Sequence, residues 1–205
     1  MQRPVTLVAV SKTISASGVR EAFMAGQRDF GENYLQEAMP KMAALDDLRK
    51  RGIVWHFIGP LQSNKLKLVA THFDWVHGVE QLKSAVALSR HRSGHKALNV
   101  CVQVNVSDEA SKSGVAPGDA LALVTQVALL PNLTVQGLMT IIENTADEAT
   151  QRAQFRKMRT LFDAMQFGGM AVDTLSMGMS QDFKVAIAEG ATMVRIGSAI
   201  FGARG

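Results

Sequence analysis

The sequence is poor in several features that define particular protein classes. It has one cysteine, Cys101, so no disulfide can form within the chain; we expect a reducing compartment and a core role for Cys101. No apolar run approaches the roughly 20 residues that span a bilayer. The first residues, MQRPVT, lack the apolar stretch of a secretion signal. We therefore expect a cytoplasmic protein that does not act on a membrane.

The chain also has no segment in which residues of one charge are concentrated. The formal net charge is +4, but the basic residues are scattered and rarely clustered with aromatic residues, as a nucleic-acid surface requires. We expect no nucleic-acid partner, although a mildly positive field suits small anionic ligands. No G-x-G-x-x-G fingerprint follows the first apolar segment, which argues against a dinucleotide-binding sheet.

The chain does contain a regular alternation of short apolar segments and amphipathic stretches. Several of the apolar segments are apolar on both faces, as parallel strands covered on both sides are. The alternation predicts a single-domain β/α barrel of the TIM type over residues 1–205, with an open doubly wound sheet as the alternative. The eight candidate strands cover residues 5–12, 28–33, 54–59, 73–79, 99–106, 133–141, 173–180 and 192–200.

Two predicted helices carry specific expectations. Pro40 should break or kink the helix that follows the second strand, because proline lacks an N–H group and clashes with the preceding turn. Ser180 can cap the last long helix, in which Phe183, Ala186 and Ile187 are expected to face inward.

The chain begins almost directly at the first strand and ends soon after the eighth. We therefore expect a barrel without a covering helix after its last strand, unless another chain or an absent segment supplies one. We expect a monomer, with an oligomer formed through this uncovered edge as the alternative.

The stretch VAVSKT, residues 8–13, places a lysine at the end of an apolar strand. Lys12 shares a strand face with Val8 and Val10, and in a barrel it lies at the rim where active sites form. Apolar surroundings lower the pKa of a lysine, and a neutral amine can attack a carbonyl carbon. The alternative is a structural lysine whose stem packs on the barrel while its ammonium group reaches water.

A second group of polar residues lies at the other end of the chain. Arg195, Gly197 and Ser198 occur in RIGSAIFG, and the preceding loop SMGMS offers Ser176 and Ser180. In β/α barrels phosphate often binds at the loops after strands seven and eight, where backbone N–H groups of a short helix are available. The alternative is that the glycines are simple turns and the serine a helix cap.

In a closed barrel the first strand neighbours the eighth, so a ligand with both an aldehyde and a phosphate would reach both groups. Pyridoxal 5'-phosphate carries both on one small ring. The motifs VAVSKT, RDFGENYLQE, WHFIGPLQSNK, VQVNVSDEASKSG, LSMGMSQDF and MVRIGSAIFG, taken in order, resemble the pyridoxal phosphate homeostasis protein (YggS/PROSC) family over nearly the whole chain. The resemblance implies a barrel similar to the N-terminal domain of alanine racemase, with pyridoxal phosphate held on Lys12 as an internal aldimine.

The resemblance also implies roles for individual residues. Ser180, Gly197 and Ser198 are expected to hold the phosphate, and Arg195 to face the pyridine nitrogen. Lys112, in the loop DEASKSG, is a possible second lysine for the cofactor, whereas a solvated loop lysine is the alternative. The family's N-terminal helix and a short C-terminal tail are absent from this sequence. The cofactor-binding residues implied are Lys12, Asn33, Ser176, Ser180, Arg195, Gly197 and Ser198.

The predicted function is an intracellular cofactor carrier, and three hypotheses remain open. An arginine at the pyridine nitrogen makes the ring a weaker electron sink, and the single tyrosine, Tyr34, is not expected to face the cofactor. We therefore expect a non-catalytic protein of pyridoxal phosphate homeostasis, which could hand its cofactor to apo-enzymes. The alternatives are a pyridoxal-phosphate-dependent amino-acid racemase or decarboxylase, and a cofactor-free Schiff-base aldolase. No metal site is expected.

Overall fold

The structure is a closed barrel of eight parallel strands. The computed structural model describes residues 4–107, 109 and 112–202, so the two ends of the predicted domain 1–205 and part of the loop before Lys112 lie outside the described residues. Each strand pairs with the next, and β8 pairs with β1 through Thr6↔Met193 to Ala9↔Ile196. This closure confirms the predicted single-domain barrel and excludes the open sheet. The strands are β1 Thr6–Val10, β2 Asp29–Glu32, β3 Val54–Phe57, β4 Trp75–Val79, β5 Leu98–Gln103, β6 Leu133–Met139, β7 Thr174–Ser176 and β8 Met193–Ile196.

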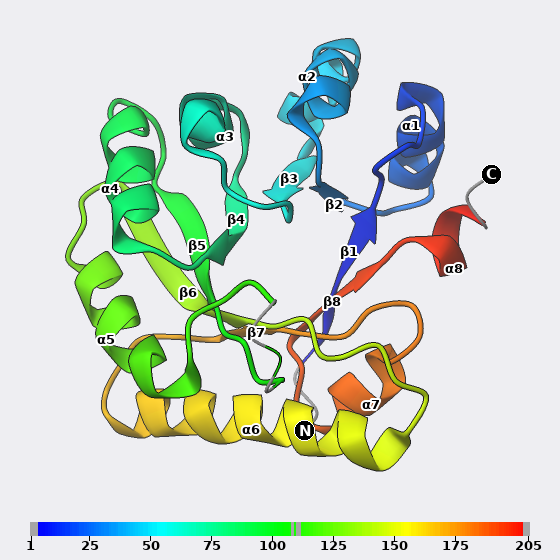
Figure 1. Cartoon of the computed structure of the whole chain (residues 1–205). Coiled ribbons are helices and arrows are strands. Elements are labelled where there is room, and N and C mark those ends of the chain that lie inside the picture. Colours follow the sequence, from blue (N-terminus) through cyan, green and yellow to red (C-terminus); the bar gives the residue numbers. More distant parts are fainter. Residues whose placement is uncertain (1–3, 108, 110–111, 203–205) are drawn as a thin grey trace.

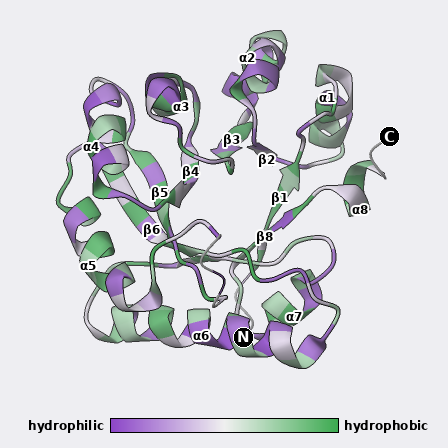
Figure 2. Ribbon diagram, viewed as in Figure 1, coloured by the Kyte–Doolittle hydropathy of each residue, from purple (hydrophilic) through white to green (hydrophobic). Residues whose placement is uncertain are grey.

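The helices lie around the outside of the strands, as Figure 1 shows. They are α1 Ala16–Met24, α2 Leu35–Ala44, α3 Leu66–His72, α4 Leu82–His91, α5 Pro117–Ala128, α6 Glu148–Phe167, α7 Phe183–Ala188 and α8 Ser198–Phe201, with 3-10 turns at Asp46–Arg51 and Ser63–Lys65. The bands of opposite hydropathy along these helices in Figure 2 are those of amphipathic helices that bury one face. Among the described residues, no helix combines the length and apolar character needed to cross a bilayer.

The main hydrophobic core lies between the strands and the helices. Successive strand residues face opposite sides of the sheet. Along β8, Val194 and Ile196 belong to this core, whereas Arg195 between them lines a pocket at the end of the barrel. The same alternation places Phe30 and Trp55 in the outer core, with their ring centroids 5.9 Å apart. The strand residues that alternate with these core residues therefore face the interior of the barrel.

Several helix ends carry the residues that helix starts and stops favour. Pro117 is the first residue of α5, where its missing N–H group costs no hydrogen bond. The carboxylate of Asp147 accepts a hydrogen bond from Thr150 N at the start of α6, and Gly168 ends that helix. The seven-residue α3 has no counterpart among the predicted helices.

The structure differs from three expectations about helices: a break at Pro40, a cap at Ser180 and an inward-facing Ile187. Pro40 is exposed and α2 continues through it to Ala44, so the helix tolerates the loss of one backbone hydrogen bond. Ser180 does not cap α7; Asp182 is the N-cap residue, and Ser180 Oγ accepts from Gly197 N instead. Within α7, Ala186 is buried but Ile187 is 37% exposed and faces out, because the helix is too short to bury a broad apolar face.

Candidate functional site

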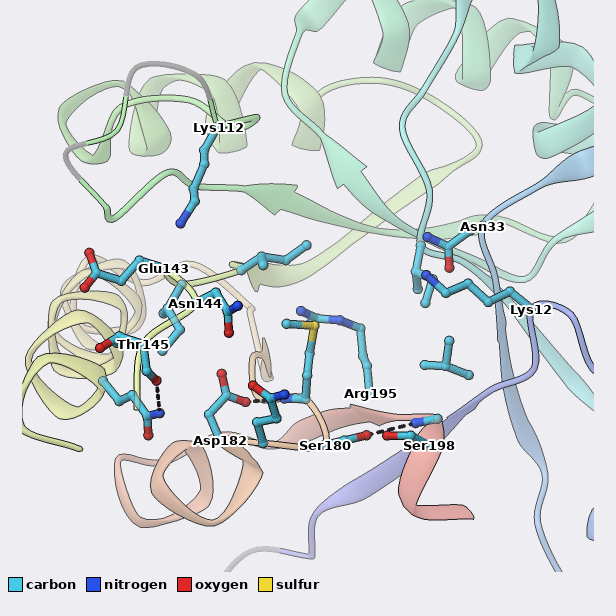
Figure 3. Close-up of a pocket in the computed structure, with 18 residues that line it drawn as sticks. Lys12, Asn33, Lys112, Glu143, Asn144, Thr145, Ser180, Asp182, Arg195 and Ser198 are labelled. Carbon is cyan, nitrogen blue, oxygen red and sulfur yellow. Dashed lines mark hydrogen bonds between the residues drawn. The ribbon is translucent and has the colours of Figure 1, made fainter. Parts of the chain in front are cut away.

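One pocket at the carboxyl ends of the strands contains nearly all of the predicted site residues. Its volume is ≈ 780 Å³, within the range of about 300–1,000 Å³ that small-molecule sites occupy. Figure 3 shows the side chains that line it. The predicted residues among them are Lys12, Asn33, Lys112, Ser180, Arg195, Gly197 and Ser198.

Lys12 reaches into this pocket from the end of β1. It follows Ser11 directly after the strand, and Val10 on the same strand face also lines the pocket. The shared face of Val10 and Lys12 is therefore as predicted. Figure 3 shows the lysine side chain extended toward the interior of the pocket. A primary amine is thus available inside a partly enclosed space, where it can react with a bound carbonyl group.

Ser180, Gly197 and Ser198 meet at one side of the pocket (Figure 3). The N–H group of Gly197 donates to Ser180 Oγ at 3.4 Å. Gly197 immediately precedes α8, and the first N–H groups of any helix have no acceptor within that helix. Hydroxyls and free backbone N–H groups are the donors that bind phosphate in proteins, so this side of the pocket has the chemistry of an anion site.

Arg195 brings a buried positive charge to the pocket. The residue is 4% exposed, and burial lowers the pKa of its guanidinium group to about 10, so it stays cationic at neutral pH. Its nearby negative partner is Asp182, whose carboxylate opposes that shift. Burial in turn raises the pKa of Asp182. The pocket therefore combines a fixed cation with a carboxylate that sequence reasoning did not identify.

Ser176 occupies a different place from the other predicted residues. It is fully buried and is not among the residues that line the pocket. Its hydroxyl accepts a hydrogen bond from Arg195 Nη1 at 2.7 Å and contacts His77 Nδ1 at 3.0 Å. The structure therefore places Ser176 behind Arg195, where it holds the guanidinium group. Direct contact between Ser176 and a cofactor stays a prediction.

Asn33 supplies an unsatisfied acceptor at the pocket wall. Its side-chain oxygen is buried and has no hydrogen-bond partner among the described residues. A buried polar atom without a partner costs about 1–3 kcal/mol unless a ligand or water satisfies it. This atom is therefore placed to accept a hydrogen bond from a ligand hydroxyl or ring substituent.

Lys112 lies away from Lys12 on the opposite side of the pocket (Figure 3). Its ammonium group pairs with Glu109 Oε1 at 2.9 Å. It also lines a second pocket of ≈ 310 Å³, which shares Asn33 with the first. The position between two pockets is compatible with the predicted second lysine site, which stays a prediction.

Sequence reasoning missed several polar residues that the fold brings to the site. Glu143, Asn144 and Thr145 line the pocket from the segment after β6, which has no motif of its own. His77 contacts Ser176 from β4, and the only sequence signal for it was a histidine inside an otherwise apolar strand. Within the described residues, no group of three or more His, Cys, Asp or Glu side chains is arranged to hold a metal ion.

Comparison with known proteins gives the family. The family model described as "Alanine racemase, N-terminal domain" matches residues 1–205. The pyridoxal phosphate homeostasis protein of Pseudomonas aeruginosa is 58% identical over 201 residues, which are 98% of this chain and 85% of that protein. The chain belongs to the family of pyridoxal phosphate homeostasis proteins. The family resemblance inferred from the motifs is thus confirmed.

Other members of this family agree in length and fold. The pyridoxal phosphate homeostasis protein of Escherichia coli strain K12 is 49% identical over 201 residues, covering 98% of this chain and 86% of that protein. The structure of PipY from Synechococcus elongatus with PLP bound matches with a TM-score of 0.88 and 40% identity. The match covers 97% of this chain and 92% of PipY, so the two chains share the barrel over nearly their whole lengths.

Proposed function

We propose that this protein binds pyridoxal 5'-phosphate in the ≈ 780 Å³ pocket and acts in the homeostasis of that cofactor. One observation carries the proposal: Lys12 lines the same pocket as Ser180, Gly197 and Ser198, whose hydroxyl and backbone N–H groups are hydrogen-bond donors. Bound pyridoxal phosphate supplies a reactive aldehyde and an electron-withdrawing ring. Lys12 would supply an amine for the aldehyde, and Ser180, Gly197 and Ser198 would hold the phosphate.

The relatives support this assignment. The two curated relatives are named as pyridoxal phosphate homeostasis proteins, and PipY was solved with PLP bound. The residues of this chain fit the same ligand. The unsatisfied oxygen of Asn33 would accept a hydrogen bond from the ligand, and the guanidinium group of Arg195, which also lines the pocket, would donate to its ring nitrogen.

The same residues favour a protein that holds the cofactor over an enzyme that uses the cofactor for catalysis. A guanidinium group can only donate hydrogen bonds, so Arg195 keeps the ring nitrogen unprotonated and weakens the electron sink. Racemisation also needs a proton donor on each face of the substrate. The single tyrosine, Tyr34, is 50% exposed and lies outside the residues that line the pocket.

An amino-acid racemase or decarboxylase is the second candidate, because two further acid–base groups, Glu143 and Asp182, do line the pocket. Glu143 lines it on the side away from Lys12 (Figure 3). Incubation of the loaded protein with a panel of amino acids, followed by measurement of enantiomers and amines, separates the two functions. If the protein turns over an amino acid and Glu143→Gln abolishes that turnover, the result supports the enzymatic function and contradicts the carrier function.

The proposal includes the setting in which the protein works. A carrier of pyridoxal phosphate would deliver it to apo-enzymes that use this cofactor. We place the protein in the cytoplasm as a monomer, without a nucleic-acid or membrane partner. Light scattering of the purified protein, with and without pyridoxal phosphate, checks the oligomeric state.

Reduction of the loaded protein tests the site directly. Borohydride converts a C=N bond between lysine and the cofactor into a stable amine, and peptide mass mapping then finds the labelled residue. The label is expected on Lys12 and is expected to be lost in Lys12→Ala. The matched control is Lys67→Ala, which removes an exposed lysine outside the pocket and should keep the label. A label confined to Lys112 in the unmodified sequence would overturn the assignment of Lys12.

A further inference from the structure

A continuous chain of hydrogen bonds runs through the inside of the barrel behind the pocket. Arg195 Nη1 donates to Ser176 Oγ at 2.7 Å, and Ser176 Oγ lies 3.0 Å from His77 Nδ1. His77 Nε2 lies 2.9 Å from His56 Nδ1, and His56 Nε2 lies 2.9 Å from Asp29 Oδ1. We call these five side chains the interior hydrogen-bond chain.

The interior hydrogen-bond chain joins two ends of the barrel that are far apart in sequence. Arg195 lines the pocket near the end of β8, whereas Asp29 is the first residue of β2 and therefore lies at the opposite end of the barrel. The side chain of Asp29 is 27% exposed. Ser176, His56 and His77, which lie between, are all 0% exposed.

With both histidines neutral, the carboxylate of Asp29 fixes the direction of the hydrogen bonds that join Asp29, His56, His77 and Ser176. A carboxylate only accepts, so neutral His56 must donate from Nε2 to Asp29 and accept at Nδ1. His77 must then donate from Nε2 and accept at Nδ1, and Ser176 must donate its hydroxyl proton to His77. The guanidinium group only donates, so Ser176 accepts from Arg195 at the other end. The Asp29 end therefore requires the pair of Nε2–H tautomers, and the donation from Arg195 to Ser176 is compatible with that pair.

We propose that His77 is a positioning residue for Arg195, held in its tautomer by His56 and Asp29; its effect on the cofactor rests on the proposed function. Arg195 is held at two points. Nη1 bonds to Ser176, and Nη2 donates to the carbonyl oxygen of Thr140 at 2.9 Å. Two fixed contacts on one planar group set its orientation and decide which N–H group it presents to the pocket.

The surroundings of His77 keep it in the state that this role needs. Burial lowers its pKa well below the ordinary value, and the nearby positive charge of Arg195 acts in the same direction. A neutral His77 can accept the hydroxyl proton of Ser176, whereas an imidazolium could not. Asp29 supplies the negative end that favours the donating Nε2–H form of His56.

Three variants separate the hydrogen-bonding role of His77 from its packing role. His77→Gln keeps one acceptor and one donor in a neutral side chain, whereas His77→Leu keeps the bulk and removes both. Met139→Leu is the matched control, because Met139 is 1% exposed and the substitution conserves volume without polar change. Chemical denaturation of each variant establishes that it is folded.

The first measurement uses the full-length protein without cofactor. Long-range ¹H–¹⁵N correlation spectra report histidine tautomers, and arginine side-chain spectra report rotation of the guanidinium group. His56 and His77 are expected as neutral Nε2–H tautomers, with slowly exchanging Nη signals for Arg195. The Nη signals should average in His77→Leu and persist in Met139→Leu and largely in His77→Gln. An Nδ1–H tautomer at His77, or unchanged Arg195 signals in His77→Leu, would overturn the proposal.

The second measurement uses added pyridoxal phosphate. His77→Leu should bind it about tenfold more weakly and shift its visible absorption band, because a misplaced guanidinium group leaves a buried polar contact unmade. His77→Gln should recover most of both. If the unmodified protein binds no pyridoxal phosphate, the proposed function fails while the spectra without cofactor still judge the positioning of Arg195. Identical affinity and absorption in His77→Leu would remove its role toward the cofactor.

Discussion

At the scale of single residues, Gly178 shows how the absence of a side chain lets the loop after β7 pack against α7 and β8. Its φ is +98°, in the region that favours glycine. Its carbonyl oxygen accepts from Arg195 N at 2.9 Å, which ties the loop after β7 to β8. An added Cβ would lie 2.6 Å from Ala186 Cβ, so the loop and α7 could not both keep their places.

Gly178→Ala is therefore expected to reduce the free energy of unfolding by about 2–4 kcal/mol, from backbone strain and overpacking together. Gly94→Ala is the control, since Gly94 has a φ of +81° but open space around it. Gly94→Ala should reduce the free energy of unfolding only through backbone strain, by about 1–2 kcal/mol. Urea denaturation of both variants measures the difference. Equal losses would show that the contact with Ala186 relaxes freely.

Cys101 illustrates a residue whose predicted role was purely structural. It is fully buried in β5, and burial raises the pKa of its thiol to about 12. The reactive form of cysteine is the thiolate, so this side chain is inert at neutral pH. Its role as a core residue is confirmed.

At the scale of secondary-structure elements, α2 supports the strand that carries Lys12. Lys41 on α2 forms an ion pair with Glu32 at 2.6 Å, and both side chains are at most 6% exposed. Lys41 Nζ also donates to the carbonyl oxygen of Ser11, the residue before Lys12. Ser11 Oγ donates to the same carboxylate oxygen of Glu32. The helix thereby fixes the backbone beside the reactive amine.

Pro40 lies in the interior of α2 and makes this helix less stable than it would be with alanine at the same position. Relative to alanine, a proline in a helix interior destabilises the folded protein by about 3 kcal/mol. Because proline also restricts the unfolded chain, it offsets up to about 1 kcal/mol of that loss. Pro40→Ala is therefore expected to raise the free energy of unfolding by about 2 kcal/mol. Lys157→Ala, at an exposed position of α6, should change it by less than about 0.5 kcal/mol. A loss of stability in Pro40→Ala, measured by urea denaturation, would show that the proline fits its backbone.

At the scale of the whole molecule, the buried side chain of His77 makes stability depend on pH. Burial lowers the pKa of His77 in the folded protein, so below about pH 6.5 the unfolded chain binds a proton that the folded chain does not. The free energy of unfolding should therefore decrease as the pH falls from 7 toward 5. The slope is expected to be smaller in His77→Gln, which cannot titrate.

Urea denaturation at pH 7.5, 6.5 and 5.5 measures this dependence in both proteins. The acidic residues with lowered pKa values, such as Asp47 and Glu189, lose their contribution only at lower pH and do not interfere. Equal slopes would show that His77 takes up its proton in the folded state without cost.

The sequence by itself determined the barrel and identified several of the residues that line its pocket. Eight apolar segments alternating with amphipathic ones leave few folds that bury every strand on both faces. Because all parallel strands end at one rim, Lys12 and Gly197 had to approach each other once the barrel closed. Those conclusions depend on periodicity and topology, which are local properties repeated along the chain.

Only the tertiary structure decided which residues act on each other across the barrel. Ser176 was predicted beside the cofactor and lies behind Arg195. Ser180 was predicted as a helix cap and accepts from Gly197 N. His77 joins Ser176, although 99 residues separate them in sequence. Such contacts depend on strand register and side-chain direction, and a one-residue shift in register would send every one of these side chains to the other face.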